Sequence, residues 1–390
     1  MQHSEKRPHR RDDRGGKRSS SSSSGRGGGG RSGGPGGRGR SGQNTEPRPE
    51  SGPVPVKAPV SEGPGYEAHS ELLESVSRTF FLSIKGLPVE MRDPVALGYL
   101  VARATDTIAD ATRAPIDLRL ELLRAFSKMF KEGWEPIAGK RLARELGEGL
   151  KPGEKLLLEK AGELIGWYDQ MPEFEQLELL RVWSRISHAQ ELDLTRFGNP
   201  ANGGVVSLAT TRDLDEYTYL IAGSVGEFWT RLAAKRCPDF SKVAPAEMEK
   251  RGVNFGKALQ LINVLRDFPG DLKQGRCYLP AEELEQAGVD PAALAENPAL
   301  ARSVHARWLG IAREHMESAY AYTEAVQNRA IRLACSLPLA IGSRTLTILE
   351  KDEDAINRPV KITRNQVTGL VAKGIAASWL PFLLPKYLRG

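Results

Sequence analysis

One stretch of this 390-residue chain, GKALQLINVLRDFPGDLKQGRCYLP at residues 256–280, constrains the fold more than any other. Four of its residues are spaced by four, three and four positions, so a helix places them on one face. Leucine, isoleucine and valine cover the rest of that helix, and a helix that is apolar nearly all round is buried. The remaining face carries Gly256, Gln260, Asn263 and Asp267. It must therefore line an internal polar network or a cavity.

A second stretch, GYLVARATDTIAD at residues 98–110, repeats the pattern with Tyr99, Arg103, Asp106 and Asp110 on one face. Each helix thus carries two aspartates four residues apart, and such pairs lie about 5–6 Å apart and repel. A single pair of this kind usually lies on a solvated helix face. Two pairs in apolar helices, each with a nearby arginine, instead favour Mg²⁺, which takes one or two carboxylates and completes its shell with waters and substrate phosphates.

The composition is uneven along the chain. The net charge is +6, but residues 1–57 alone contribute +8, which leaves −2 for the remainder. This segment is rich in Gly, Ser and Arg and cannot bury enough apolar surface to become ordered, so we predict a disordered tail over residues 1–65. Arg-Gly runs can bind nucleic acid through its phosphates. Because the tail lacks aromatic residues for base stacking, a solvated extension is the favoured interpretation and nucleic-acid binding is not expected.

From residue 66 onward, apolar residues at steps of three and four predict helices nearly throughout. Alternating strand patterns and a βαβ rhythm are missing, which argues against a Rossmann domain. We therefore predict one all-α domain over residues 66–390. Its clearest helices are expected at 117–131, 155–169, 174–197, 213–235, 246–273 and 297–325.

Cysteine usage and hydropathy bear on the compartment. Cys237, Cys277 and Cys335 are odd in number and form no CxxC pair, which points to a reducing compartment without disulfides or a zinc site. No apolar run reaches the length of a membrane span. The C-terminal segment 369–384 is either a last core helix or a surface that rests on lipid. We expect a cytoplasmic protein. The alternative is a protein with peripheral contact at the inner face of the membrane.

Further polar residues lie on otherwise apolar helices. Ser77 and Arg78 could bind phosphate oxygens or simply cap a helix. Asp193 could face a cavity or the surface. Tyr217 and Tyr219 precede small residues that permit close helix approach, and tyrosines on helices more often belong to the core.

The two aspartate pairs, the arginines and the apolar interior suit one kind of chemistry. Carboxylates bind Mg²⁺, and Mg²⁺ together with arginine binds diphosphate and stabilises it as a leaving group. An apolar, water-poor cavity then protects a carbocation from capture by water. The sequence therefore predicts the ionisation of an allylic prenyl diphosphate.

These residues resemble a known family, the squalene/phytoene synthases, which are head-to-head prenyltransferases with an all-α isoprenoid-synthase fold around a central cavity. The resemblance runs from about Ser70 to the C-terminus. It rests on four motifs that occur in the family's order, SRTFFL, YLVARATDTIAD, YTYLIAGSVG and ALQLINVLRDFPGDLKQGRCYLP.

The resemblance also implies roles for individual residues. The Mg²⁺ ligands would be Asp106, Asp110, Asn263, Asp267 and Asp271. Arg266 would take part in catalysis or hold the carboxylates in place. The residues that would bind the substrate diphosphates are Ser77, Arg78, Tyr99, Arg103, Gln260 and Arg276.

Two details depart from a regular pattern. A tyrosine before Ile221 would assist proton loss in the first half-reaction, but many relatives carry that tyrosine where this chain has Leu220, so Tyr219 and Tyr217 are both candidates. Pro269 has no N–H to donate, so the helix should kink or end near it. Asp271 would then reach its metal from a distorted last turn.

The motifs SRTF, DTIAD and ISHAQELDL resemble those of bacterial squalene synthases. This resemblance implies a monomer that condenses two farnesyl diphosphates through presqualene diphosphate to squalene, using Mg²⁺ and NADPH. The alternatives within the family are a phytoene synthase and a relative that forms presqualene diphosphate or hydroxysqualene. A hypothesis of another class is a nucleic-acid- or membrane-associated protein that acts through its basic tail. The intact aspartates, Asn263 and the arginines argue against it.

Overall fold

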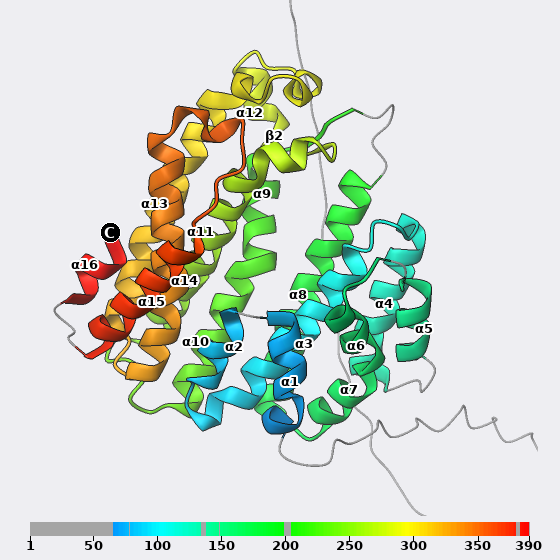
Figure 1. Cartoon of the computed structure of the whole chain (residues 1–390), viewed down its shortest axis with the longest axis vertical. Helices are drawn as coiled ribbons and strands as arrows, with labels where there is room; N and C mark the ends of the chain where they lie inside the picture. Colours follow the sequence, from blue (N-terminus) through cyan, green and yellow to red (C-terminus); the bar gives the residue numbers. More distant parts are fainter. Residues whose placement is uncertain are drawn as a thin grey trace, which may run out of the picture. The chain divides into compact units, whose positions relative to one another are not determined.

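The computed structural model of the chain describes residues 65–77, 79–133, 138–147, 149–198, 204–379 and 383–389. These residues all fall within one compact unit, Pro53–Gly390. Residues 1–64, which hold nearly all of the predicted tail, and Arg78 lie outside them. Helices dominate the described part of the chain (Figure 1), which confirms the predicted all-α fold.

The helices of the N-terminal half follow one another with short connections. Periodicity located the fourth and eighth of them to within one residue at each end, whereas the predicted helix 155–169 is interrupted at Lys160. These helices are α1 (Gly65–Ser77), α2 (Thr79–Lys85), α3 (Val89–Ala109), α4 (Ile116–Glu132), α5 (Ala138–Glu145), α6 (Pro152–Glu159), α7 (Ala161–Asp169) and α8 (Glu173–Phe197).

The C-terminal half is organised around one long helix, α11. It packs against α10, α13 and α14 (Figure 1). The elements are β1 (Val206–Leu208), α9 (Thr211–Thr218), η2 (Tyr219–Gly223), α10 (Ser224–Arg236), α11 (Pro245–Leu272), β2 (Arg276–Pro280), α12 (Ala281–Gln286), η3 (Pro291–Ala295), η4 (Pro298–Ala301), α13 (Arg302–Ala325), α14 (Arg329–Lys351), η5 (Glu353–Ile356), α15 (Arg364–Trp379) and α16 (Leu384–Arg389).

Helix α11 is buried as its sequence predicted. Ala258, Leu261, Ile262 and Leu265 are almost fully excluded from solvent. The helix continues through Pro269 and ends at Leu272, so it stops within one turn of the proline and Asp271 lies in that last turn.

Two features of the chain did not follow from the periodicity. Segment 213–235, predicted as one helix, is divided by a π-helical turn at Tyr219–Gly223, and such a turn inserts a residue and rotates the side chains before it relative to those after it. Strands β1 and β2 pair in parallel, with Val206 opposite Arg276. They are too short to show an alternating pattern.

The C-terminal segment packs through a narrow edge. Helix α15 contacts α14 and α16, and Gly374 and Ala377 are its buried positions among those described. None of the described helices is long and apolar enough to cross a membrane. The three cysteines are buried, and none of them forms a disulfide.

Helix α11 approaches α10 and the adjoining turn η2 through glycines. A Cβ on Gly226 would lie 1.9 Å from the carbonyl oxygen of Gly252, and one on Gly256 would lie 2.0 Å from that of Ala222. Backbone atoms cannot yield as flexible side chains do, so a methyl group forces the two helices apart.

We predict that Gly226→Ala lowers the free energy of unfolding by about 1–3 kcal/mol, because the helices must separate to admit the methyl group. The control is Gly310→Ala in α13, where no atom lies within 4 Å and alanine favours the helix by up to about 1 kcal/mol. Urea unfolding of both variants measures the difference. Equal stability of the two would contradict the close approach.

Candidate active site

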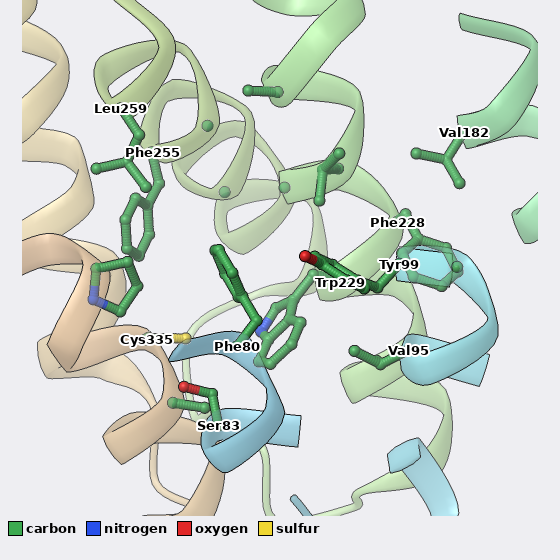
Figure 2. Close-up of a pocket in the computed structure, with 18 of the residues that line it drawn as sticks. Phe80, Ser83, Val95, Tyr99, Val182, Phe228, Trp229, Phe255, Leu259 and Cys335 are labelled. Carbon is green, nitrogen blue, oxygen red and sulfur yellow. The ribbon is translucent and has the colours of Figure 1, made fainter. Parts of the chain in front are cut away.

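An apolar cavity of about 360 Å³ lies between α2, α3, α8, α10, α11 and α14. Figure 2 shows Phe80 from α2 pointing into it, with Tyr99, Trp229 and Phe255 around it. Its volume falls in the range of small-molecule sites. Nearly all of its wall is hydrocarbon, so it suits a long apolar chain.

Polar residues begin one helical turn beyond this cavity. On a helix, residues four positions apart lie on the same face. Three of the cavity's helices carry a polar residue four positions after a lining residue. Asp106 follows Ala102 on α3, Gln190 follows Ile186 on α8, and Asn263 follows Leu259 on α11.

The first aspartate pair lies at the end of α3. Asp106 accepts a hydrogen bond of 2.5 Å from Nε2 of Gln190, and burial together with the charge of Asp110 raises its pKa to about 6. Burial also raises the pKa of Asp110. Arg119, which the sequence analysis did not identify, donates to the carbonyl oxygen of Ala109 at 2.7 Å and so holds this end of the helix.

The second pair lies at the end of α11. Asp267 is exposed and accepts two hydrogen bonds from Arg266, at 2.9 and 2.5 Å. Burial and the charge of Asp267 raise the pKa of Asp271 to about 7. The pair therefore repels as the sequence predicted, and more strongly because one member is largely shielded from water.

Arg276 connects the two pairs. It begins β2, and the pairing of β2 with β1 fixes its backbone. Its charge lowers the pKa of both Asp110 and Asp271, which opposes the effect of burial. The structure thus brings the two stretches together around one guanidinium.

A fifth aspartate joins the two pairs. Asp193 on α8 accepts a hydrogen bond of 2.7 Å from the hydroxyl of Tyr278, and burial raises its pKa to about 6. The sequence alone leaves open whether Asp193 faces a cavity or the surface, and it does not identify Tyr278 or Gln190 as site residues. The available signal was the three-residue spacing of Gln190 and Asp193, which places both on one face of α8.

The two candidate tyrosines lie in different surroundings. Tyr217 is buried, stacks on Tyr278 with 4.7 Å between ring centroids, and its hydroxyl lies 3.4 Å from Nε2 of Gln260. Tyr219 instead donates to Glu227 at 2.9 Å and lies under the guanidinium of Arg185. The structure therefore places Tyr217 with the carboxylates and Tyr219 in a separate ion-pair network.

The remaining predicted residues surround the cluster. Tyr99 lines the cavity and donates to the carbonyl oxygen of Val76 at 3.3 Å. Arg103 pairs with Glu154 of α6 at 2.7 Å. Ser77 ends α1, and its buried hydroxyl has no hydrogen-bond partner in the part of the chain that the structure describes.

Asn263 and Arg266 line a second cavity, of about 250 Å³, between α2, α11 and α14. Its wall shares Phe80, Leu259 and Pro338 with the first cavity. The two cavities therefore adjoin, and the second has a polar end of its own.

The donor set fits Mg²⁺ bound jointly with a ligand. Among the described residues, no group of three or more His, Cys, Asp or Glu side chains is arranged to hold a metal ion by itself. Mg²⁺ does not need such a group, because it is usually bound by one or two carboxylates plus phosphates. The raised pKa values of Asp106 and Asp271 show the cost of their negative charge, which a cation would relieve.

We predict that Asp271→Asn stabilises the metal-free protein at pH 8 by on the order of 1 kcal/mol. Folding raises the pKa of Asp271 to about 7, so at pH 8 the carboxyl is ionised and its charge lowers the stability of the folded state. The same variant should lose most of the rise in melting temperature that Mg²⁺ with inorganic diphosphate gives the wild type. The control is Glu314→Gln, which removes an exposed charge on α13. A full rise in Asp271→Asn would contradict the assignment of this metal ligand.

Comparisons with known proteins identify relatives of this chain. A family model described as squalene/phytoene synthase matches residues 73–366, which is more than half of the chain. The squalene synthase of Saccharomyces cerevisiae is 26% identical over 325 residues, covering 82% of this chain and 69% of its own. That of Schizosaccharomyces pombe is 26% identical over 324 residues, covering 82% and 67%.

Solved structures show the same fold. A complex of TcSQS with the ligand E5700 has a TM-score of 0.64 at 23% identity and covers 83% of this chain and 90% of its own. A second TcSQS complex, with BPH1237, has a TM-score of 0.63 at 22% identity. Together with the family match, this confirms the prediction made from the four motifs. The chain belongs to the squalene/phytoene synthase family.

Proposed function

We propose that this protein is a squalene synthase-type prenyltransferase that joins two farnesyl diphosphates head to head and forms squalene. One observation carries the proposal. Two aspartate pairs, both influenced by the charge of Arg276, lie on two of the helices that wall an apolar cavity, beyond its lining residues. A diphosphate needs the polar part, and its isoprenoid chain needs the cavity.

The two adjoining cavities support a reaction between two chains. They meet at Phe80, Leu259 and Pro338, so two isoprenoid chains could lie in contact there. The larger cavity is almost entirely apolar, whereas the smaller also carries Asn263 and Arg266. This difference would let one diphosphate stay held while the other leaves.

The chain's own groups account for the ionisation. The aspartates would hold Mg²⁺, which, when bound, stabilises the charge of the departing diphosphate. Arg103, Arg266 and Arg276 would orient the phosphate oxygens and share that charge. The hydrocarbon wall of the cavity keeps water from the allylic cation.

The final step requires a hydride donor, because squalene is more reduced than presqualene diphosphate. The resemblance to the family implies NADPH. No strand–loop–helix segment among the described residues is glycine-rich. We also propose that α15, which is largely exposed, gives a peripheral membrane contact for so apolar a product.

We predict that the protein incubated with farnesyl diphosphate and Mg²⁺ forms squalene only when NADPH is added, and presqualene diphosphate without it. Product extraction and mass spectrometry identify each species. Chelation of Mg²⁺ should stop both reactions. Hydroxysqualene, or presqualene diphosphate with NADPH present, would assign the protein to the other family activities. Turnover of geranylgeranyl diphosphate alone would indicate a phytoene synthase.

We predict that Tyr217→Phe lowers the rate of presqualene diphosphate formation by about 100-fold or more, because its hydroxyl lies among the carboxylates where proton transfer is needed. Tyr219→Phe is the matched control and should stay within about threefold of wild type. Single-turnover assays without NADPH compare them. The reverse order of effects would restore Tyr219 as the residue that assists proton loss.

A further inference from the structure

One face of α8 joins the first aspartate pair to the tyrosines. Gln190 and Asp193, three residues apart, both point into the polar cluster. Gln190 donates to Asp106, and Asp193 accepts from Tyr278. The cluster is thus continuous from the metal-binding end of α3 to the tyrosine pair.

Tyr278 holds both of its neighbours. It follows Arg276 by two positions on β2, so the same strand pairing fixes its backbone. Its hydroxyl donates a hydrogen bond to Oδ2 of Asp193 at 2.7 Å, and its ring stacks on that of Tyr217 with 29° between the ring planes. The other carboxylate oxygen, Oδ1, is buried and accepts no hydrogen bond from the described residues.

The protonation states in this group are unequal. Burial raises the pKa of Tyr217 well above its usual value, so the phenol is neutral at physiological pH. Burial raises the pKa of Asp193 only to about 6, so most of that carboxyl is ionised. A neutral phenol can take up a proton only as it gives up its own. Tyr278 contacts both groups, so it holds the carboxylate of Asp193 beside the phenol of Tyr217.

We propose that Asp193, positioned by Tyr278, receives the hydroxyl proton of Tyr217 on Oδ1 while Tyr217 takes a proton from the substrate. This inference rests on the proposed function. In cyclopropane formation, a substrate C–H bond breaks and its electron pair forms the last ring C–C bond. The proton passes to the oxygen of Tyr217 as the tyrosine's own proton passes to Asp193, so charge and atoms balance. Asp193 and Tyr278 are therefore positioning residues that act through Tyr217.

Two variants test the two parts of the arrangement. Tyr278→Phe keeps the stacked ring and removes only the hydroxyl that holds Asp193. Asp193→Asn keeps the shape and removes the proton acceptor. In assays of presqualene diphosphate formation without NADPH, kcat should fall about 10-fold for the first and about 100-fold for the second, with KM for farnesyl diphosphate within about twofold.

The second half-reaction separates this role from a structural one. When presqualene diphosphate and NADPH are supplied directly, both variants should form squalene at the wild-type rate. The control is Tyr320→Phe, which also removes a buried phenol hydroxyl, bonded to Ser343 at 2.8 Å, but outside the cluster. It should leave both half-reactions unchanged.

A double-mutant cycle tests the path through Tyr217. Once Tyr217→Phe is present, adding Asp193→Asn should cost nothing further, because residues that act as one unit are not additive. Additive losses, equal losses in both half-reactions, or full activity of both single variants would overturn the inference while leaving the proposed function intact. A wild-type protein that does not consume farnesyl diphosphate would overturn both.

Discussion

Negative charge inside an apolar helical bundle is the constraint on which the rest of this structure depends. The helices that carry the aspartate pairs are packed into the bundle, so the carboxylates of Asp106 and Asp271 are largely shielded from water. This loss of hydration raises the pKa of both. Arg276 offsets part of this cost for both pairs, and a two-stranded sheet fixes its position. The remaining charge favours cations and the diphosphates that accompany them, so the site is more stable when it is filled.

The same helices build the apolar and the polar halves of the site. Since each helix places residues at four-position intervals on one face, a wall residue and a ligand residue differ by a single turn. The spacing of about 5–6 Å between them is fixed by the helix rather than by loops. A shift of one helix would therefore move its wall residue and its polar residue together.

The sequence predicted what depends on local spacing. Helices α4, α8 and α11 and the two aspartate pairs follow from periodicity within single helices. The roles of Tyr278 and Asp193 depend instead on contact between β2 and α8, and the strand is too short to be seen in a pattern. The choice between Tyr217 and Tyr219 likewise depended on tertiary contacts, with Tyr278 of β2 for the first and with Glu227 and Arg185 for the second, which local spacing does not reveal.

The ion pair between Arg103 and Glu154 has a consequence for turnover. In the proposed reaction, an incoming diphosphate competes for this guanidinium with a carboxylate that the protein itself supplies, so part of the affinity gained there is offset by the weakened ion pair. Glu154, as an internal competitor, lowers the affinity of the site for the diphosphates of substrate and product alike. Glu154 would return to Arg103 as diphosphate departs, which resets the site for the next cycle.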